Sequence, residues 1–232
     1  MSVGDIATAA PEILATPHWR RDLLELAAGY ALILLVIWTP RPWQRPLFWA
    51  AAIFLAAVLW LRFDGWQAMG LRRTNLARSI WVTALAFLIA TPTILIAQRF
   101  HTLQPYTGAA RFIQRYWGYA LWTFVQQVLL QDFFLRRLLR LVGPPPYAAF
   151  TAAALFSLAH LPNPVLTAVT FVWGFMACLL FLSYRNLYPL AMAHAILGIT
   201  VAITLPSPII RNMRVGLGYL TYPAHHPRQP RS

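Results

Sequence analysis

Seven apolar segments follow one another along this chain, each long enough to form a helix that crosses or nearly crosses a lipid bilayer. They cover about residues 23–39, 47–61, 79–97, 116–141, 147–161, 164–184 and 189–205. A spanning helix needs about 20 mainly apolar residues, and an open sheet edge cannot face lipid. The sequence therefore predicts an all-α fold, a polytopic transmembrane helix bundle of about seven helices, within a range of about six to eight.

The composition supports the same class of protein. Of the 232 residues, 59% are hydrophobic and 11% are charged, and the net charge is +13. Such a charge suits nucleic acid when it forms one patch, but these arginines are scattered at the ends of the apolar segments. There they anchor helices and contact anionic headgroups. We therefore expect an integral, multi-pass protein of a bacterial inner (plasma) membrane, with membrane lipids and no nucleic acid as partners.

Polar and proline-rich stretches divide the chain into four parts. Residues 1–22 form an N-terminal cytoplasmic or interfacial segment, and residues 23–114 hold the N-terminal transmembrane helices and interfacial loops. Residues 115–205 form a core with an intramembrane polar site, and residues 206–232 form a basic tail that is interfacial or disordered. Before the tail, ten arginines lie on the side of the N-terminus and five on the other, which favours a cytoplasmic N-terminus.

Ionisable and amide side chains lie inside three of the apolar segments. They are Gln127, Gln131, Asp132, Arg136, His160 and His194. A charged side chain at membrane depth costs about 2.5–3.5 kcal/mol on insertion scales, so such a residue indicates function by default. At a rise of about 1.5 Å per residue, all of them fall in a comparable layer of the bilayer, reached from one face. This agreement favours one site over three separate structural roles.

Each of these groups also has a structural interpretation. Asp132 and Arg136, one helical turn apart, would form an ion pair that makes the helix easier to insert. A histidine in an apolar helix is often a hydrogen-bonded packing residue, and glutamines form hydrogen bonds between helices. The functional interpretation is favoured only because the groups occur together at one depth.

Three motifs, in this order, resemble those of the CPBP family of intramembrane proteases, which includes the CAAX-processing endoproteases and the lysostaphin-resistance-protein-A-like proteins. Family members carry Glu-Glu-x-x-x-Arg, then Phe-x-x-x-His, then His-x-x-x-Asn or Asp on a later helix. The matching segments here are Gln131-Asp132-Phe133-Phe134-Leu135-Arg136, Phe156-Ser157-Leu158-Ala159-His160, and His194 with Gly198 at the last position. The resemblance covers about residues 115–205.

The resemblance implies the roles of the site residues. The catalytic residues would be Gln131, Asp132, Arg136, His160 and His194, and the substrate-binding residues Gln127, Phe156 and Gly198. In the family, the first Glu and the two His activate a water, and the Asn helps to hold the oxyanion.

Two of these positions differ here. Gln131 cannot act as a general base, because an amide does not accept a proton at neutral pH. Gly198 offers no donor to an oxyanion. Either the site is rebuilt, with Asp132 or a neutral histidine as the base and a glutamine as the amide donor, or the hydrolytic activity has been lost.

The leading hypothesis is an intramembrane endopeptidase that cleaves a membrane-embedded or lipidated peptide, with Asp132, His160 and His194 central. No cofactor is expected. These same three residues would suit a zinc ion with an open position, but the His-Glu-x-x-His spacing is absent. The alternative is a catalytically inactive relative that binds or scaffolds membrane segments, which Gln131 and Gly198 motivate. A small transporter or proton relay is less favoured, since no pair of Gly- or Pro-broken helices is evident.

Overall fold

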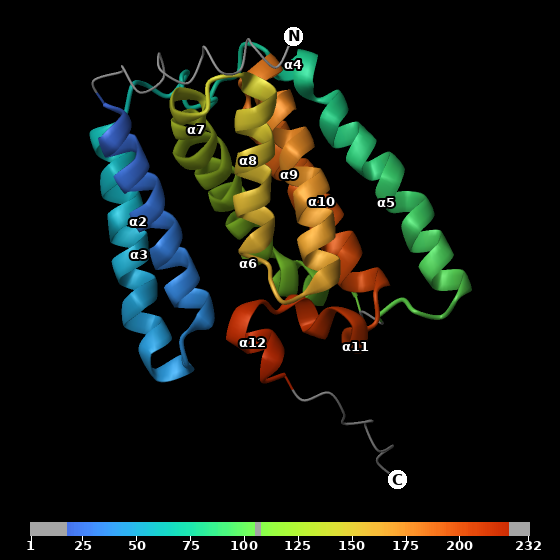
Figure 1. Cartoon of the computed structure of the whole chain (residues 1–232). Helices are drawn as coiled ribbons and strands as arrows, with labels where there is room; N and C mark the ends of the chain where they lie inside the picture. The colour runs from blue at the N-terminus through green and yellow to red at the C-terminus, as the bar shows by residue number, and fades with distance from the viewer. Residues whose placement is uncertain (1–17, 105–107, 223–232) are drawn as a thin grey trace, which may run out of the picture.

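A computed structural model describes residues 18–104 and 108–222, and every regular element in these ranges is a helix (Figure 1). The elements are α2 (Trp19–Trp38), α3 (Arg41–Leu61), α4 (Leu76–Ser79), α5 (Trp81–Arg99), α6 (Ala109–Val128), the π-helix η1 (Leu129–Leu135), α7 (Arg136–Leu141), α8 (Pro145–Leu158), α9 (Pro164–Tyr184), α10 (Leu187–Thr204), α11 (Ser207–Ile210), the 3-10 helix η2 (Arg211–Met213) and α12 (Gly216–Leu220). The prediction of an all-α bundle is confirmed. Each predicted segment corresponds to one helix, or to the continuous run α6–η1–α7 for residues 116–141.

Four helices of the described chain are long and apolar enough to cross a membrane. They are Arg41–Leu61, Leu76–Arg99, Pro164–Tyr184 and Leu187–Thr204. Large apolar side chains on all four are exposed in the isolated chain, including Ile53, Leu88, Val172 and Met192. Lipid can cover such faces, whereas water makes them costly. The chain is therefore an integral membrane protein.

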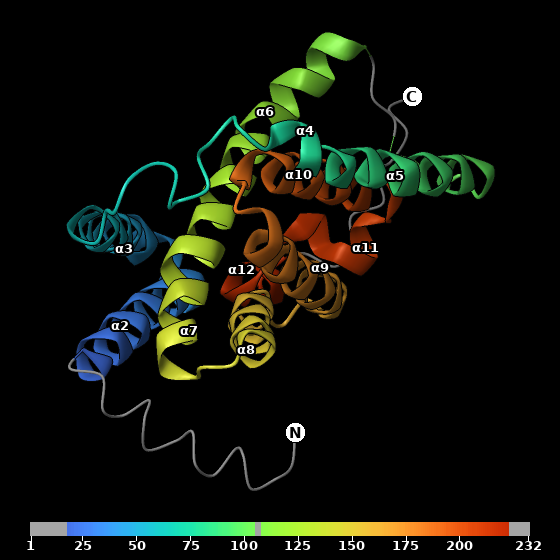
Figure 2. The ribbon, with the colours of Figure 1, turned by 90° about the horizontal axis from the view of Figure 1, so that it is seen from above.

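The run α6–η1–α7 lies at the centre of the bundle. Seen from above, it crosses between the α2–α3 pair on one side and α5, α8, α9 and α10 on the other (Figure 2). Its contact with α2 is close at Gly29, where a Cβ would come within 2.5 Å of Cζ of the fully buried Phe133. The central run thus has one face toward α2–α3 and another toward α8–α10.

The π-helix η1 departs from the α-helix that the sequence predicts for residues 116–141. In an α-helix each N–H bonds the carbonyl four residues back, whereas here the N–H of Arg136 bonds the carbonyl of Gln131, five residues back. Gln131 and Asp132 both lie within this wider segment. Short π segments occur frequently at functional sites, so the position of this one is of interest.

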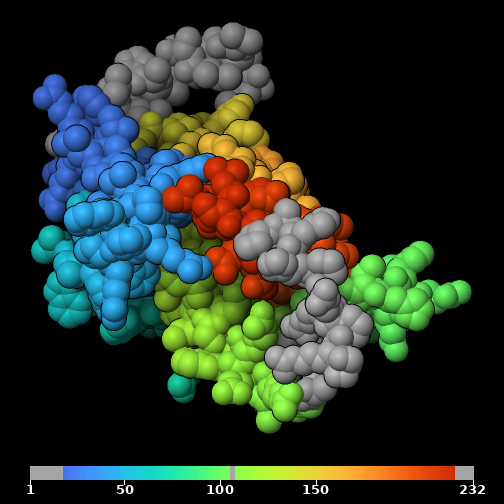
Figure 3. Space-filling model, turned by 90° about the horizontal axis from the view of Figure 1, so that it is seen from below, coloured from blue at the N-terminus to red at the C-terminus, as the bar shows by residue number. Residues whose placement is uncertain are grey.

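Parts of the predicted segments 1–22 and 206–232 lie outside the described residues. Within the described part of the tail, α12 returns to the bundle beside the end of α2 (Figure 3). The N–H of Gly216 donates to the carbonyl of Leu161 at 2.7 Å. Gly216 has a φ of +55°, and a Cβ there would come within 2.1 Å of Ile37. Only glycine permits this approach, because other residues are strained at that φ and lack the space.

Candidate functional site

A hydrogen-bonded chain of side chains joins η1, α6 and α10. Gln131 Nε2 donates to Gln127 Oε1 at 3.2 Å, and Gln127 Nε2 lies 3.1 Å from His194 Nδ1. All three side chains are buried. Because an amide nitrogen only donates, His194 Nδ1 accepts this bond and the proton of the neutral ring is on Nε2. His194 Nε2–H is thus available as a donor.

His160, just beyond the end of α8, has the opposite arrangement. Its Nδ1 lies 2.8 Å from the carbonyl oxygen of Phe156. A carbonyl only accepts, so the proton of neutral His160 is on Nδ1 and Nε2 keeps a free lone pair. The Phe156 ring packs edge-on against both imidazoles, with centroids 5.0 Å from His160 and 6.0 Å from His194. The structure therefore brings together one imidazole that accepts and one that donates.

Two buried polar atoms beside these groups have no hydrogen-bond partner in the described chain. They are the acceptor Gln131 Oε1 and the donor Trp173 Nε1. The Trp173 ring lies 5.9 Å from the His194 ring. Buried polar groups are normally paired, so an unpaired acceptor and an unpaired donor beside the histidines are an exception.

Gly198, one turn beyond His194 on α10, faces a residue that the sequence analysis did not select. A Cβ at this position would come within 1.9 Å of Tyr119 Oη, so the Tyr119 hydroxyl fills the space of a side chain at position 198. Tyr119 precedes Gln127 by eight residues, two turns of α6, and so shares its face. That spacing is the only feature of the sequence that could have identified Tyr119 as a site residue, since a tyrosine in an apolar segment is ordinarily a packing residue.

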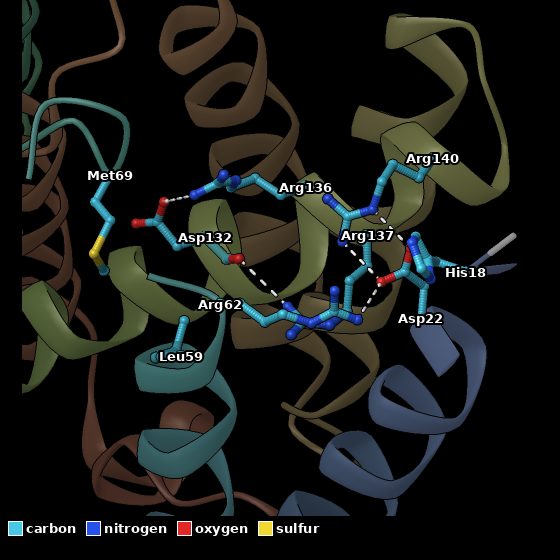
Figure 4. Close-up of a pocket in the computed structure, with 9 residues that line it drawn as sticks. All are labelled: His18, Asp22, Leu59, Arg62, Met69, Asp132, Arg136, Arg137 and Arg140. Carbon is cyan, nitrogen blue, oxygen red and sulfur yellow. Dashed lines mark hydrogen bonds and ion pairs between the residues drawn. The ribbon is translucent and has the colours of Figure 1, made fainter. Parts of the chain in front are cut away.

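Asp132 and Arg136 lie on the other face of the central run, toward α2–α3 (Figure 4). Asp132 Oδ1 is 3.7 Å from Arg136 Nη1, and the Asp132 side chain is only 1% exposed. Neither oxygen of this carboxylate has a hydrogen-bond partner in the described chain. Arg136 also makes a two-pronged ion pair with Asp64. The adjacent residues Gln131 and Asp132 thus have different surroundings: Gln131 lies in the hydrogen-bonded chain with His194, and Asp132 pairs with Arg136.

Two groups of ion pairs lie beside Asp132, and together they hold all four carboxylates in residues 18–104 and 108–222. Arg136 pairs with Asp64 and Asp132 in one group. The other group joins the carboxylates of Asp22 and Glu25 to Arg21, Arg62, Arg137 and Arg140. The shortest buried pairs join Arg140 to Asp22 at 2.7 Å and Arg137 to Glu25 at 2.8 Å. The hydrogen bond from Arg136 holds the pKa of Asp64, in the loop after α3, below its usual range. The Asp22–Glu25 group joins α2 and the end of α3 to α7, and the Asp132 group joins η1 and the loop after α3 to α7.

The zinc set considered from the sequence is not assembled by these contacts. In the described ranges, no group of three His, Cys, Asp or Glu side chains gathers as a metal-binding set. Asp132, the carboxylate of that set, pairs with Arg136 instead. The independence of the protein from any cofactor stays a prediction.

Comparison with known families gives one match. Residues 112–200 match the family model described as type II CAAX prenyl endopeptidase Rce1-like. The matched segment runs from α6 into α10 and contains every predicted site residue. No curated protein and no solved structure matches the chain. The family resemblance read from the three motifs is confirmed.

Proposed function

We propose that this chain, whose residues 112–200 belong to the Rce1-like family, is an intramembrane endopeptidase that cleaves a hydrophobic or lipidated peptide in a bacterial inner membrane. One observation carries the proposal: the two imidazoles have complementary hydrogen-bond roles. His160 binds a carbonyl through Nδ1 and leaves Nε2 free to accept a proton. His194 accepts at Nδ1 and presents Nε2–H as a donor.

In the proposed reaction, His160 Nε2 takes a proton from a water as the water oxygen attacks the scissile carbonyl carbon. His194 Nε2–H and the Tyr119 hydroxyl donate to the oxyanion that forms. When the tetrahedral intermediate collapses, the C–N bond breaks and the proton on His160 passes to the leaving nitrogen. General acid–base catalysis of this kind contributes about 10²–10⁴-fold, and one oxyanion donor about 2.7–4 kcal/mol.

This proposal gives the base to a histidine, one of the two options that the sequence left open, and not to Asp132. The Asp132 carboxylate is 3.7 Å from the Arg136 guanidinium and borders the α2–α3 side of the bundle. Its proposed part is to balance charge beside Arg136. Gln131 and Gln127 orient His194 through their hydrogen-bonded chain and take no proton.

The test is cleavage of a hydrophobic peptide library by purified protein in lipid nanodiscs, followed by mass spectrometry of the products. His160→Asn and His194→Asn should each lower turnover by about 10²-fold or more. His101→Asn is the matched control, because His101 is an exposed loop histidine with a φ of 56°, which Asn tolerates. Asp132→Asn should retain turnover within about fivefold, since it leaves the hydrogen bonds of both histidines in place. Equal turnover in all variants would exclude the histidine mechanism.

A second candidate is a catalytically inactive relative that binds membrane segments. The observation that favours it is that every carboxylate of the described chain is paired with arginine, and none contacts the histidines. Restoring the family residues would require three changes, because a side chain at Gly198 collides with Tyr119 Oη. An inactive natural protein whose Gln131→Glu, Tyr119→Ala, Gly198→Asn variant cleaves peptides would support this candidate.

A further inference from the structure

We propose that the cavity on the α2–α3 side of η1 and α7 binds the headgroup of a phospholipid, through a phosphodiester and a neighbouring hydroxyl or ammonium group. This site is distinct from the one at His160 and His194. It does not depend on whether the protein cleaves peptides.

The cavity has the size of a headgroup. Its volume is about 220 Å³, and it opens between α2, the end of α3, the loop after α3, and the η1–α7 turn (Figure 4). Pockets for drug-sized ligands measure about 300–1,000 Å³, so this one suits a smaller group and not a folded peptide segment. Leu59 and Met69 form apolar parts of its wall, and Asp132 and Arg62 are among its polar parts.

The charge around the cavity favours an anion. Across the two groups of ion pairs beside it, five guanidinium groups face four carboxylates, which leaves one positive charge in excess. Arg185, at the end of α9, lies close enough to contribute to the lowered pKa of Asp64, and so adds positive charge. A phosphodiester carries one negative charge and is a preferred partner of arginine.

Two groups at the cavity have unused bonding capacity. The buried Asp132 carboxylate has no hydrogen-bond donor from the described chain at either oxygen. Arg62 is shared between Asp22 at 3.4 Å and Glu25 at 3.2 Å, which are longer contacts than the 2.7 Å of the Arg140 pair. A phosphate bound at Arg62, beside an O–H or N–H group that donates to Asp132, satisfies both.

The position of the cavity indicates a lipid as the source of that phosphate. Arg62 directly follows the apolar helix α3, a candidate membrane span. The exposed rings of Trp60, Phe63 and Trp66 pack on one another here, with centroids 6.4 Å and 4.9 Å apart. Tryptophan gathers at the boundary between membrane and water, and basic pockets between membrane helices bind lipid headgroups.

The test is native mass spectrometry of the full chain in detergent, titrated with phosphatidylglycerol, phosphatidylethanolamine and phosphatidylcholine of matched acyl chains. The first two should bind at least about fivefold more tightly than phosphatidylcholine, which has no O–H or N–H donor. Arg62→Gln should weaken binding of the first two by about tenfold, and Asp132→Asn should abolish their advantage over phosphatidylcholine. Arg99→Gln, an exposed arginine at the end of α5 away from the cavity, is the control and should change nothing.

Met69→Trp is a second variant, which fills the cavity from the loop without removing an ion pair. It should also weaken binding of phosphatidylglycerol. A thermal unfolding scan checks that each variant is folded.

Unchanged lipid binding in folded Arg62→Gln and Met69→Trp would overturn the proposal. So would equal affinity of the natural protein for phosphatidylcholine. Displacement of phosphatidylglycerol by equimolar inorganic phosphate would instead identify a site for a soluble anion. Displacement by a peptide with a free terminal carboxylate, but not by a second phospholipid, would identify a peptide site.

Discussion

Gln131 and Asp132 are neighbours on one π-helical turn, yet they belong to two regions of opposite character. Around Gln131 the polar groups are amides, imidazoles and a phenol, and none of the carboxylates in the described chain contacts them. Around Asp132, the polar groups are carboxylates and guanidiniums held in ion pairs. A buried charge is costly unless it is paired, whereas a neutral polar group needs only a hydrogen-bond partner. The central run α6–η1–α7 thus separates two regions. One is the neutral site around Gln127, Gln131, His160 and His194, which suits proton transfer. The other is the charged joint, the ion pairs of Asp22, Glu25, Asp64 and Asp132, which attaches α2–α3 to the bundle.

Variants of the two regions should therefore affect different quantities, the free energy of unfolding or turnover. Changes in the charged joint should alter the free energy of unfolding and leave the chemistry at His160 nearly unchanged. Changes around the histidines should alter turnover and leave stability nearly unchanged. A variant that moved both quantities equally would show that the two regions are one.

The largest effect on stability is expected for Glu25→Ala. Arg137 is 2% exposed. Without Glu25 its buried guanidinium would keep only the carbonyls of Phe133 at 2.8 Å and Asp132 at 3.5 Å, and the Phe133 ring. Removing one partner of a buried pair destabilises by about 3–5 kcal/mol, because the other charge stays buried and unpaired. The measurement is equilibrium unfolding in mixed micelles.

The control for Glu25→Ala is Arg21→Ala, which removes an exposed partner of the same carboxylate. Arg21 is 55% exposed, and it pairs with Glu25 one turn along α2. Such pairs contribute about 0.3–0.5 kcal/mol. Equal losses for the two variants would contradict the importance of the buried Arg137 pair.

The next largest effect is expected for Tyr119→Phe, on turnover. Loss of one oxyanion donor lowers turnover by about 10²–10³-fold, equivalent to about 2.7–4 kcal/mol. Stability should change by less than about 1 kcal/mol, because only a hydroxyl with no hydrogen bond to the described chain is removed. Peptide cleavage and unfolding of the same preparation give both numbers. Turnover within about twofold of the natural protein would remove Tyr119 from the mechanism.

The sequence predicts the helices, and it selects Gln127 and His194, for local reasons. Runs of apolar residues define membrane helices whatever their packing. Gln127 and His194 are found because polar groups are rare in such runs, and their depth follows from counting residues. Their similar depth made a contact between them predictable, and the structure has one at 3.1 Å.

The charged joint was beyond such reasoning because its partners are distant in sequence. Glu25 and Arg137 are 112 positions apart, and no local pattern indicates that they meet. The π-helix was equally hidden, since no local pattern in its seven residues distinguishes them from an α-helix. The sequence left two interpretations of Asp132 open, a place beside the histidines and an ion pair with Arg136, and the structure shows the ion pair.

The smallest effect is expected for the pH dependence of Asp64, at the exposed edge of the charged joint. The hydrogen bond from Arg136 lowers the pKa of Asp64 in the folded chain. A lowered pKa stabilises the folded state above the unfolded value of about 3.9, and that stability is lost as the pH falls through the folded value. Because the Asp64 side chain is 46% exposed, the contribution is about 1 kcal/mol or less.

Asp64→Asn isolates this contribution from those of the carboxylates Asp22 and Glu25. Between pH 6 and pH 3, the natural protein should lose up to about 1 kcal/mol more of its unfolding free energy than the variant does. The difference should shrink in 1 M salt, where the Debye length is about 3 Å. A difference that grew well beyond 1 kcal/mol would mean that this edge is as well shielded from water as the Glu25–Arg137 pair. The charged joint would then derive its strength from all of its ion pairs, and not mainly from its buried pairs.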